Sequence, residues 1–154
     1  MKLSLLISTA VAIVIAGVAM SSSASGSSGA RKVPGFRSPS GNIHCYFDRR
    51  AIVPANGTKR LLTCGLQHAD YAMQLQHRCL AGDWHGFVLG AKAKPAIFCA
   101  GNANYSIRPV YTMLAYGKSR QLGPFTCTSR ITGVTCHNRT GHGLFVSRQT
   151  YRTW

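Results

Sequence analysis

The sequence predicts an all-β domain that is stabilised by disulfide bonds. Short runs rich in β-branched and aromatic residues alternate with Gly, Pro and Asn, at a spacing typical of a sandwich or a barrel-like meander. All 6 cysteines follow an apolar N-terminal segment, which indicates export to a compartment where thiols oxidise. Lys and Arg outnumber Asp and Glu by 18 to 3, so the formal net charge is +15. Together these features predict a small, basic, exported β domain.

The first segment, residues 1–24, is predicted to be a signal peptide. The run Leu3–Met20 contains no charged residue, and Ser22 and Ala24 suit the small-residue rule of signal peptidase. An uncleaved anchor is the alternative, because the run is about long enough to span a bilayer. Segment 25–35 is rich in Ser and Gly, and we expect it to be flexible. No later segment is long and apolar enough to span a membrane, so we expect a secreted or periplasmic protein with no transmembrane segment in its mature chain.

Residues 36–154 are predicted to form a single disulfide-bonded β domain, because this length suits one modest core. One short helix is expected near residues 69–78, where Ala, Met, Leu and Gln favour helix and Tyr71 and Leu75 share a face. The predicted strands are Ile43–Phe47, Leu61–Gly65, Gly86–Gly90, Ala96–Cys99, Val110–Ala115, Phe125–Ser129, Val134–Asn138 and Leu144–Ser147.

The segment Phe125–Asn138 predicts a β-hairpin. Cys127 and Cys136 are equidistant from a turn at residues 131–132, and Gly133 can adopt a positive φ next to it. The two sulfurs would then face each other across the hairpin. We therefore expect a Cys127–Cys136 disulfide.

The other four cysteines allow several pairings that the sequence leaves open. We expect pairing in chain order, as Cys45–Cys64 and Cys79–Cys99, and each closed loop would stabilise the domain by about 3 kcal/mol. Zinc is the competing interpretation, because 6 His accompany the 6 Cys. Oxidised cysteines cannot be thiolate ligands, and the chain has no Cys-x₂₋₄-Cys pattern, so we expect no metal and no cofactor.

The composition argues against most hydrolytic chemistry. Only Asp48, Asp70 and Asp83 are acidic, which disfavours a paired-carboxylate glycosidase and a two-metal nuclease. A metal-independent ribonuclease needs only two His and a cation. His142, His137 and Arg148 could supply them, with His44 and His85 as further histidines. The simpler interpretation of His142, between two glycines, is a turn residue, so whether the protein is an enzyme stays open and a non-enzyme is favoured.

Several short patterns around the cysteines are specific enough to suggest relatives. Residues 36–45 read FRSPSGNIHC, and we expect its Ser38–Asn42 portion to be a structural turn. The other landmarks are Asp83-Trp84-x-Gly86, Tyr116-Gly117, Gly123-x-Phe125-x-Cys127-x-Ser129, Gly133-x-Thr135-Cys136-x-Asn138, and Gly141-His142-Gly143 leading to Ser147-Arg148. Over roughly residues 36–152 the chain resembles a family of small secreted bacterial proteins of unknown function. The resemblance implies an exported, disulfide-bonded single domain and supplies no catalytic residues.

The excess of positive charge predicts an anionic partner. The leading hypothesis is a secreted, monomeric binding module that engages an anionic polymer of the cell envelope or an acidic protein. Arg148, Arg152 and Trp154 are candidate contacts near the C-terminus. The densest basic groups are otherwise scattered, at Arg49-Arg50, at Lys59-Arg60, and at Lys92 with Lys94. The alternatives are a small secreted ribonuclease or toxin-like hydrolase, with nucleic acid as ligand, and a protein inhibitor of a secreted hydrolase.

Overall fold

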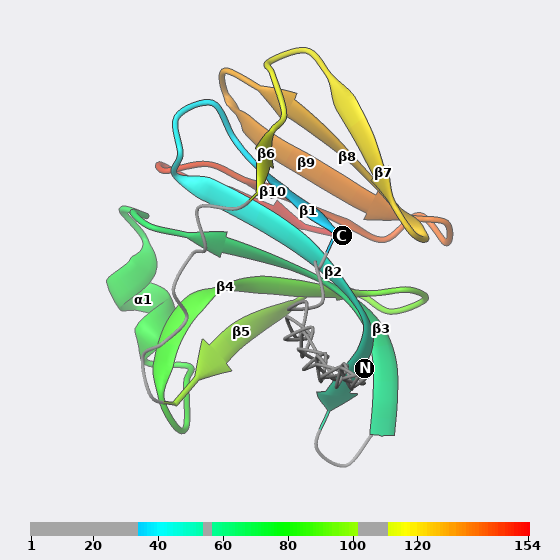
Figure 1. The fold of residues 1–154 in the computed structure, drawn as a ribbon. Helices are drawn as coiled ribbons and strands as arrows, with labels where there is room; N and C mark the ends of the chain where they lie inside the picture. Colours follow the sequence, from blue (N-terminus) through cyan, green and yellow to red (C-terminus); the bar gives the residue numbers. More distant parts are fainter. Residues whose placement is uncertain (1–33, 54–56, 102–110) are drawn as a thin grey trace, which may run out of the picture. The chain divides into compact units, whose positions relative to one another are not determined.

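The computed structural model describes residues 34–53, 57–101 and 111–154, without the side chains of residues 52, 53, 57 and 58 (Figure 1). All described residues belong to one compact unit. The predicted signal peptide lies outside the described residues, as does all of the predicted flexible segment before residue 34. Within the described ranges, no helix has the length and apolar content needed to cross a membrane.

The strands form two sheets, which confirms the predicted all-β class (Figure 1). One sheet has the order β5-β4-β3-β2-β1-β6 and the other the order β11-β10-β9-β8-β7. Neighbouring strands pair antiparallel except β1 with β6, so most connections are short turns. The strands are β1 (Gly35–Arg37), β2 (Ile43–Val53), β3 (Gly57–Leu66), β4 (Asp83–Gly90), β5 (Ala96–Ala100), β6 (Thr112–Met113), β7 (Ser119–Leu122), β8 (Phe125–Arg130), β9 (Gly133–Asn138), β10 (Gly143–Val146) and β11 (Tyr151–Thr153).

The two sheets share one hydrophobic core. Alternate residues of β8, Phe125 and Cys127 among them, are buried, as expected for a strand with one face packed. The rings of Phe47 from β2 and Phe125 from β8 meet edge to face at 5.7 Å, which places the inner faces of the sheets in contact. The two sheets therefore pack around one core, as in the predicted sandwich.

Three disulfides pair the cysteines in chain order, and two of them are fully buried in this core. Cys45–Cys64 joins directly opposite residues of β2 and β3, and Cys127–Cys136 does the same in β8 and β9. The Cys64 and Cys136 sulfurs are 3.9 Å apart, so these two disulfides pack against each other between the sheets. The third disulfide, Cys79–Cys99, links the segment after the helix to β5. The sulfurs of Cys45, Cys64 and Cys136 lie within 4.8 Å of one another, but each is used in a disulfide.

The predicted hairpin is confirmed. Strands β8 and β9 pair with Cys127 opposite Cys136 and Arg130 opposite Gly133, which leaves a two-residue turn at 131–132. Gly133 has a φ of 146°, and a Cβ there would collide with the Val146 carbonyl oxygen. Glycine is therefore required at this position both by conformation and by the close approach of β10.

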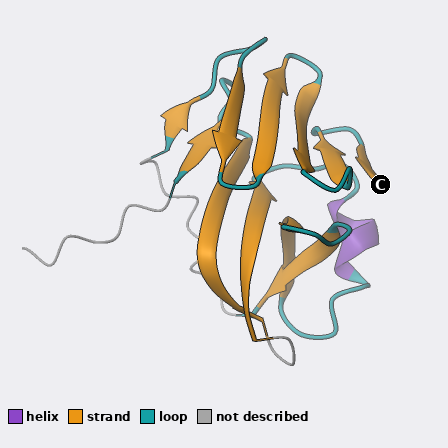
Figure 2. Ribbon diagram, turned by 90° about the vertical axis from the view of Figure 1, so that its right-hand side faces the viewer, coloured by secondary structure: helices purple, strands orange, loops and turns teal. Residues whose placement is uncertain are grey.

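The predicted helix is confirmed as one short helix, α1 (Ala72–Gln76), inside the expected range 69–78. Tyr71 and Leu75 are both buried, as their shared face predicts. The Tyr71 ring lies 5.6 Å from Trp84 and 4.9 Å from Tyr151, so the helix packs beside β4 and β11 (Figure 2). The Gln76 side chain accepts a bond from the Trp84 N–H at 2.8 Å. A helix this short is marginal alone, so these tertiary contacts hold it.

Strands β1, β7 and β11 were not expected from the sequence pattern. Each is short, with 3, 4 and 3 residues, and none shows a clear apolar alternation. Each forms because a longer neighbour offers its free edge, as β2 does for β1. The predicted strand Val110–Ala115 shrinks to β6, and Val110 lies outside the described residues.

Candidate functional site

A pocket of about 450 Å³ lies where turns of the two sheets meet. One wall comes from the turn that leads into β2 and from the segment just after β3; its residues are Ser38, Ser40, Asn42, Ile43, Gln67 and His68. Tyr116, the β8–β9 turn and residues 147–149 form the other wall. This volume is within the range of small-molecule binding sites. Three landmarks of the sequence, the Ser38–Asn42 turn, Tyr116 and Ser147-Arg148, thus lie around one cavity.

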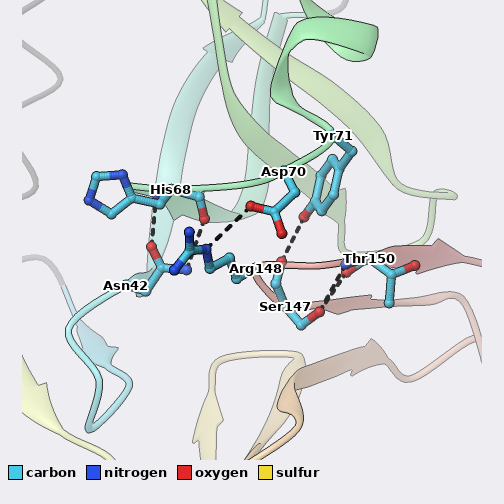
Figure 3. A network of polar contacts seen from close by, with 7 residues as sticks. All are labelled: Asn42, His68, Asp70, Tyr71, Ser147, Arg148 and Thr150. Carbon is cyan, nitrogen blue, oxygen red and sulfur yellow. Dashed lines mark hydrogen bonds and ion pairs between the residues drawn. The ribbon is translucent and has the colours of Figure 1, made fainter.

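The first wall is a tightly hydrogen-bonded turn, as expected for residues 38–42. The Ser38 N–H donates to the Ile43 carbonyl at 2.8 Å, and the Ile43 N–H donates to Ser38 Oγ at 3.1 Å. The Asn42 side chain pairs with the backbone of His68, donating to its carbonyl at 3.0 Å and accepting from its N–H at 2.8 Å (Figure 3). Asn42 therefore fastens the turn before β2 to the segment after β3.

The second wall contains the Ser147–Thr150 turn between β10 and β11. Ser147 N–H and Ser147 Oγ both donate to the Thr150 carbonyl, at 2.9 and 3.0 Å. The Tyr71 hydroxyl donates to the Ser147 carbonyl at 3.1 Å (Figure 3). Burial, together with the neighbouring Tyr151, raises the pKa of Tyr71, so its hydroxyl stays protonated and remains a donor. Arg148 and Gln149 are thus presented at the tip of a fixed turn.

Arg148 is held in place by Asp70. Its Nε donates to Asp70 Oδ1 at 3.3 Å (Figure 3). The Asp70 backbone N–H donates to the Arg148 carbonyl at 2.9 Å. Both side chains are more than half exposed, so the ion pair adds little stability. It does orient the guanidinium, whose two Nη groups have no hydrogen bond to any described residue. In the part of the chain that the structure describes, this is the one ion pair, and the pocket's second arginine, Arg130, has none.

The candidate catalytic residues do not all come together, because Arg148 lies apart from His137 and His142. His137 lies opposite Gly143 at one end of β10, and His142 is in the adjoining turn, where its N–H donates to Asn138 Oδ1 at 3.1 Å. Arg148 follows the other end of β10, and the 4 residues of this strand span about 13 Å. Of the further histidines, His44 is only 5% exposed and His85 is half-buried.

The three C-terminal candidates also separate. Of Arg148, Arg152 and Trp154, only Arg148 lines the pocket. The Arg152 guanidinium lies over the Phe145 ring, 5.2 Å from its centroid. Trp154 exchanges two 3.0 Å backbone bonds with Gly143, and its indole occupies the space that a side chain at Gly143 would need. Trp154 therefore packs on the domain, which explains the second glycine of Gly-His-Gly.

A second feature arises from a bulge that the sequence pattern did not reveal. The pairing of β2 with β3 shifts between Asp48, opposite Leu61, and Ala51, opposite Lys59. Arg49 and Arg50 therefore face the single residue Arg60 across the ladder. A bulge has no signature in composition, so three arginines that are scattered in sequence are adjacent only once the register is known.

The turn between β4 and β5 brings further cations to the same place. The Ala91 N–H donates to the Arg60 carbonyl at 3.2 Å, which sets this turn beside β3. The buried Asn138 fixes the turn from the other sheet, donating to the Gly90 and Ala93 carbonyls at 2.9 and 3.2 Å. We call the resulting exposed cations the basic end; its members are Arg49, Arg50, Lys59, Arg60, Lys92 and Lys94. None of them forms an ion pair with a described acidic residue.

These features define a small disulfide-bonded β protein with a polar pocket at one end of β2 and a cluster of cations at the other. The chain belongs to a family of unknown function, DUF6636, whose family model matches residues 10–153. No curated protein and no solved structure matches the chain. The family agrees with the resemblance drawn from the sequence and assigns no activity.

Proposed function

We propose that the protein is an exported bacterial binding module that uses its basic end to engage an anionic component of the cell envelope. The apolar run Leu3–Met20 and the three disulfides support export to a secreted or periplasmic location. The 18 basic residues against 3 acidic ones support an anionic partner. No cofactor is needed for this role.

The bulge in β2 is the observation that carries the proposal. It sets Arg49 and Arg50 against Arg60, and no described carboxylate forms an ion pair with their guanidinium groups, since Asp48 Oδ1 accepts its 2.8 Å hydrogen bond from the Arg50 backbone N–H. Like charges placed side by side repel one another, so this grouping of arginine side chains is unfavourable without an anion. An anionic ligand removes this repulsion, and guanidinium groups bind phosphate and carboxylate oxygens with two parallel hydrogen bonds.

The layout of the basic end favours a polymer over a single small anion. Its cations come from two strands and a turn, so they are spread along the molecule. A chain of repeated anionic groups can meet several of them at once, and each added contact is then intramolecular. An acidic protein is the alternative partner of the same chemistry.

The test is retention of the oxidised protein on an immobilised phosphate-rich envelope polymer such as polyglycerol phosphate. Binding at roughly 0.15 M salt and release below about 1 M are expected, because salt screens exposed charges. The variant Arg49→Gln/Arg50→Gln/Arg60→Gln should elute at markedly lower salt than the parent. The control Arg130→Gln/Arg148→Gln/Arg152→Gln loses the same charge elsewhere and should elute close to the parent.

Three results would contradict the proposal. No retention at about 0.02 M salt would exclude an electrostatic partner of this class. Equal loss of retention in both triple variants would show that net charge, and not the basic end, is responsible. Stronger displacement by RNA or by an acidic protein than by soluble polymer would assign the basic end to that partner instead.

A further inference from the structure

We infer that the pocket between the two sheets binds a carboxylated saccharide, such as a uronic acid. The pocket is separate from the basic end, because β2 runs from Ile43 in the pocket to the bulge at Arg49. Six residues of extended strand correspond to about 20 Å. This inference therefore does not depend on the polymer proposal.

The charged part of the pocket suits a single carboxylate. Arg130 and Arg148 both line it, and Asp70 is the one acidic group paired with either of them. Two guanidinium groups and one carboxylate leave one net positive charge. That balance matches a monoanionic ligand better than a dianionic phosphate. Asp70 engages only Nε of Arg148, so the two Nη groups remain oriented to bind both oxygens of a ligand carboxylate.

The rest of the lining suits a ligand with many hydroxyl groups. Gln67, Thr132 and Gln149 place hydroxyl and amide groups on both walls, whereas the Ser40 hydroxyl is already bonded to Ser38 Oγ at 3.0 Å. Such groups can both donate and accept hydrogen bonds, as sugar hydroxyls also do. Tyr116 adds an aromatic ring that is 42% exposed, which gives apolar surface for the C–H face of a sugar ring.

The pocket is held open by hydrogen bonds that need no ligand. Asn42 ties one wall to His68, and the Ser147–Thr150 turn is fixed by three backbone and side-chain bonds. Behind Tyr116, the Gly117 N–H donates to the Ser129 carbonyl at 2.7 Å. A preformed site loses little conformational entropy on binding, so a weakly interacting sugar can still be recognised.

The test is titration of the oxidised, full chain with monomeric D-glucuronate, followed by two-dimensional ¹H–¹⁵N NMR that includes the arginine Nε–H signals. Saturable shifts are expected at residues of both pocket walls, with a Kd of about 1 mM or lower. D-glucose, which lacks the carboxylate, should bind about tenfold more weakly or worse. Arg130→Gln and Arg148→Gln should each weaken glucuronate binding by about tenfold, because each removes a charged hydrogen-bond donor.

Arg49→Gln is the matched control, since it removes the same charge from the basic end and should leave the glucuronate Kd unchanged. The inference fails if glucuronate produces no saturable shifts up to about 20 mM. It also fails if glucose binds equally well, or if inorganic phosphate or a short peptide carboxylate binds more tightly than glucuronate. These outcomes leave the polymer proposal standing, because that proposal is tested with variants of Arg49, Arg50 and Arg60.

Discussion

At the scale of single residues, His44 shows how burial changes the role of a histidine. It lies opposite Arg37 in the β1–β2 ladder and is only 5% exposed. Burial, and secondarily the positive charge of Arg37, lower its pKa from 6.5 to about 4. His44 is therefore neutral near pH 7 and contributes to packing, and it is a poor proton donor for catalysis at that pH.

The shifted pKa predicts a specific acid sensitivity. The unfolded state binds a proton at His44 below about pH 6.5, whereas the folded state resists protonation down to about pH 4. The free energy of unfolding should therefore be highest above about pH 7. It should fall as the pH drops from 6.5 to 4, and His44 should account for up to about 3 kcal/mol of this loss. Urea unfolding at a series of pH values measures this slope.

His44→Gln removes the titrating group and should flatten the slope between pH 6.5 and 4, whatever its effect at pH 7. His77→Gln, which changes an exposed histidine, is the control and should keep the parent slope. The same slope in His44→Gln as in the parent would contradict the assignment.

At the scale of elements, Asn138 joins turns from opposite sheets. Its amide nitrogen donates to the carbonyls of Gly90 and Ala93 in the β4–β5 turn. Its Oδ1 accepts bonds from the N–H of Thr140 and of His142 in the β9–β10 turn. Asn138 is 2% exposed, so its own polar groups depend on these bonds to backbone groups of the two turns.

Asn138→Ala should lower the free energy of unfolding by about 3 kcal/mol, because it removes hydrogen bonds to four partly buried backbone groups in the two turns. Thr140→Val, which removes one hydroxyl bond to the same Oδ1, should cost about 1 kcal/mol or less. Equilibrium unfolding in urea measures the loss of stability in each of the two variants. A loss for Asn138→Ala no greater than that for Thr140→Val would show that the turns are held together by other contacts.

At the scale of the whole molecule, the disulfides fall into two classes of accessibility. Cys45, Cys64, Cys127 and Cys136 are fully buried between the sheets. Cys79 and Cys99 are only partly buried, outside the region where the sheets meet. A reductant can reach the Cys79–Cys99 disulfide in the folded protein. The disulfides between the sheets become accessible only when the sheets separate.

Treatment of the native protein with dithiothreitol and an alkylating agent should therefore label Cys79 and Cys99 alone. Guanidinium chloride should expose all 6 cysteines to labelling, as mass spectrometry would show. The variant Cys79→Ala/Cys99→Ala should resist labelling under native conditions. Rapid native labelling of Cys64 or Cys136 would mean that the core opens without global unfolding.

The sequence predicts the long, alternating strands and the hairpin well, since each carries its own local pattern and turn. The short strands β1, β7 and β11 escape prediction because they depend on the edge of a neighbour. Among the site residues proposed from the sequence, Arg148 lines the pocket. Arg130 and His68 also line it, but no sequence pattern distinguishes them from the other arginines and histidines. The basic residues can be read from the sequence, but the β-bulge that brings them together cannot be predicted from it.

Composition and local pattern by themselves determined the all-β class, the short helix, the Phe125–Asn138 hairpin and the strongly basic character of this protein. Only the tertiary structure decided that the Ser38–Asn42 turn, Tyr116, Arg130 and Arg148 enclose one pocket, and that Arg49, Arg50 and Arg60 stand together. The physical reason is distance along the chain. Local propensity acts over a few residues, whereas both sites depend on strand register and on how two sheets pack.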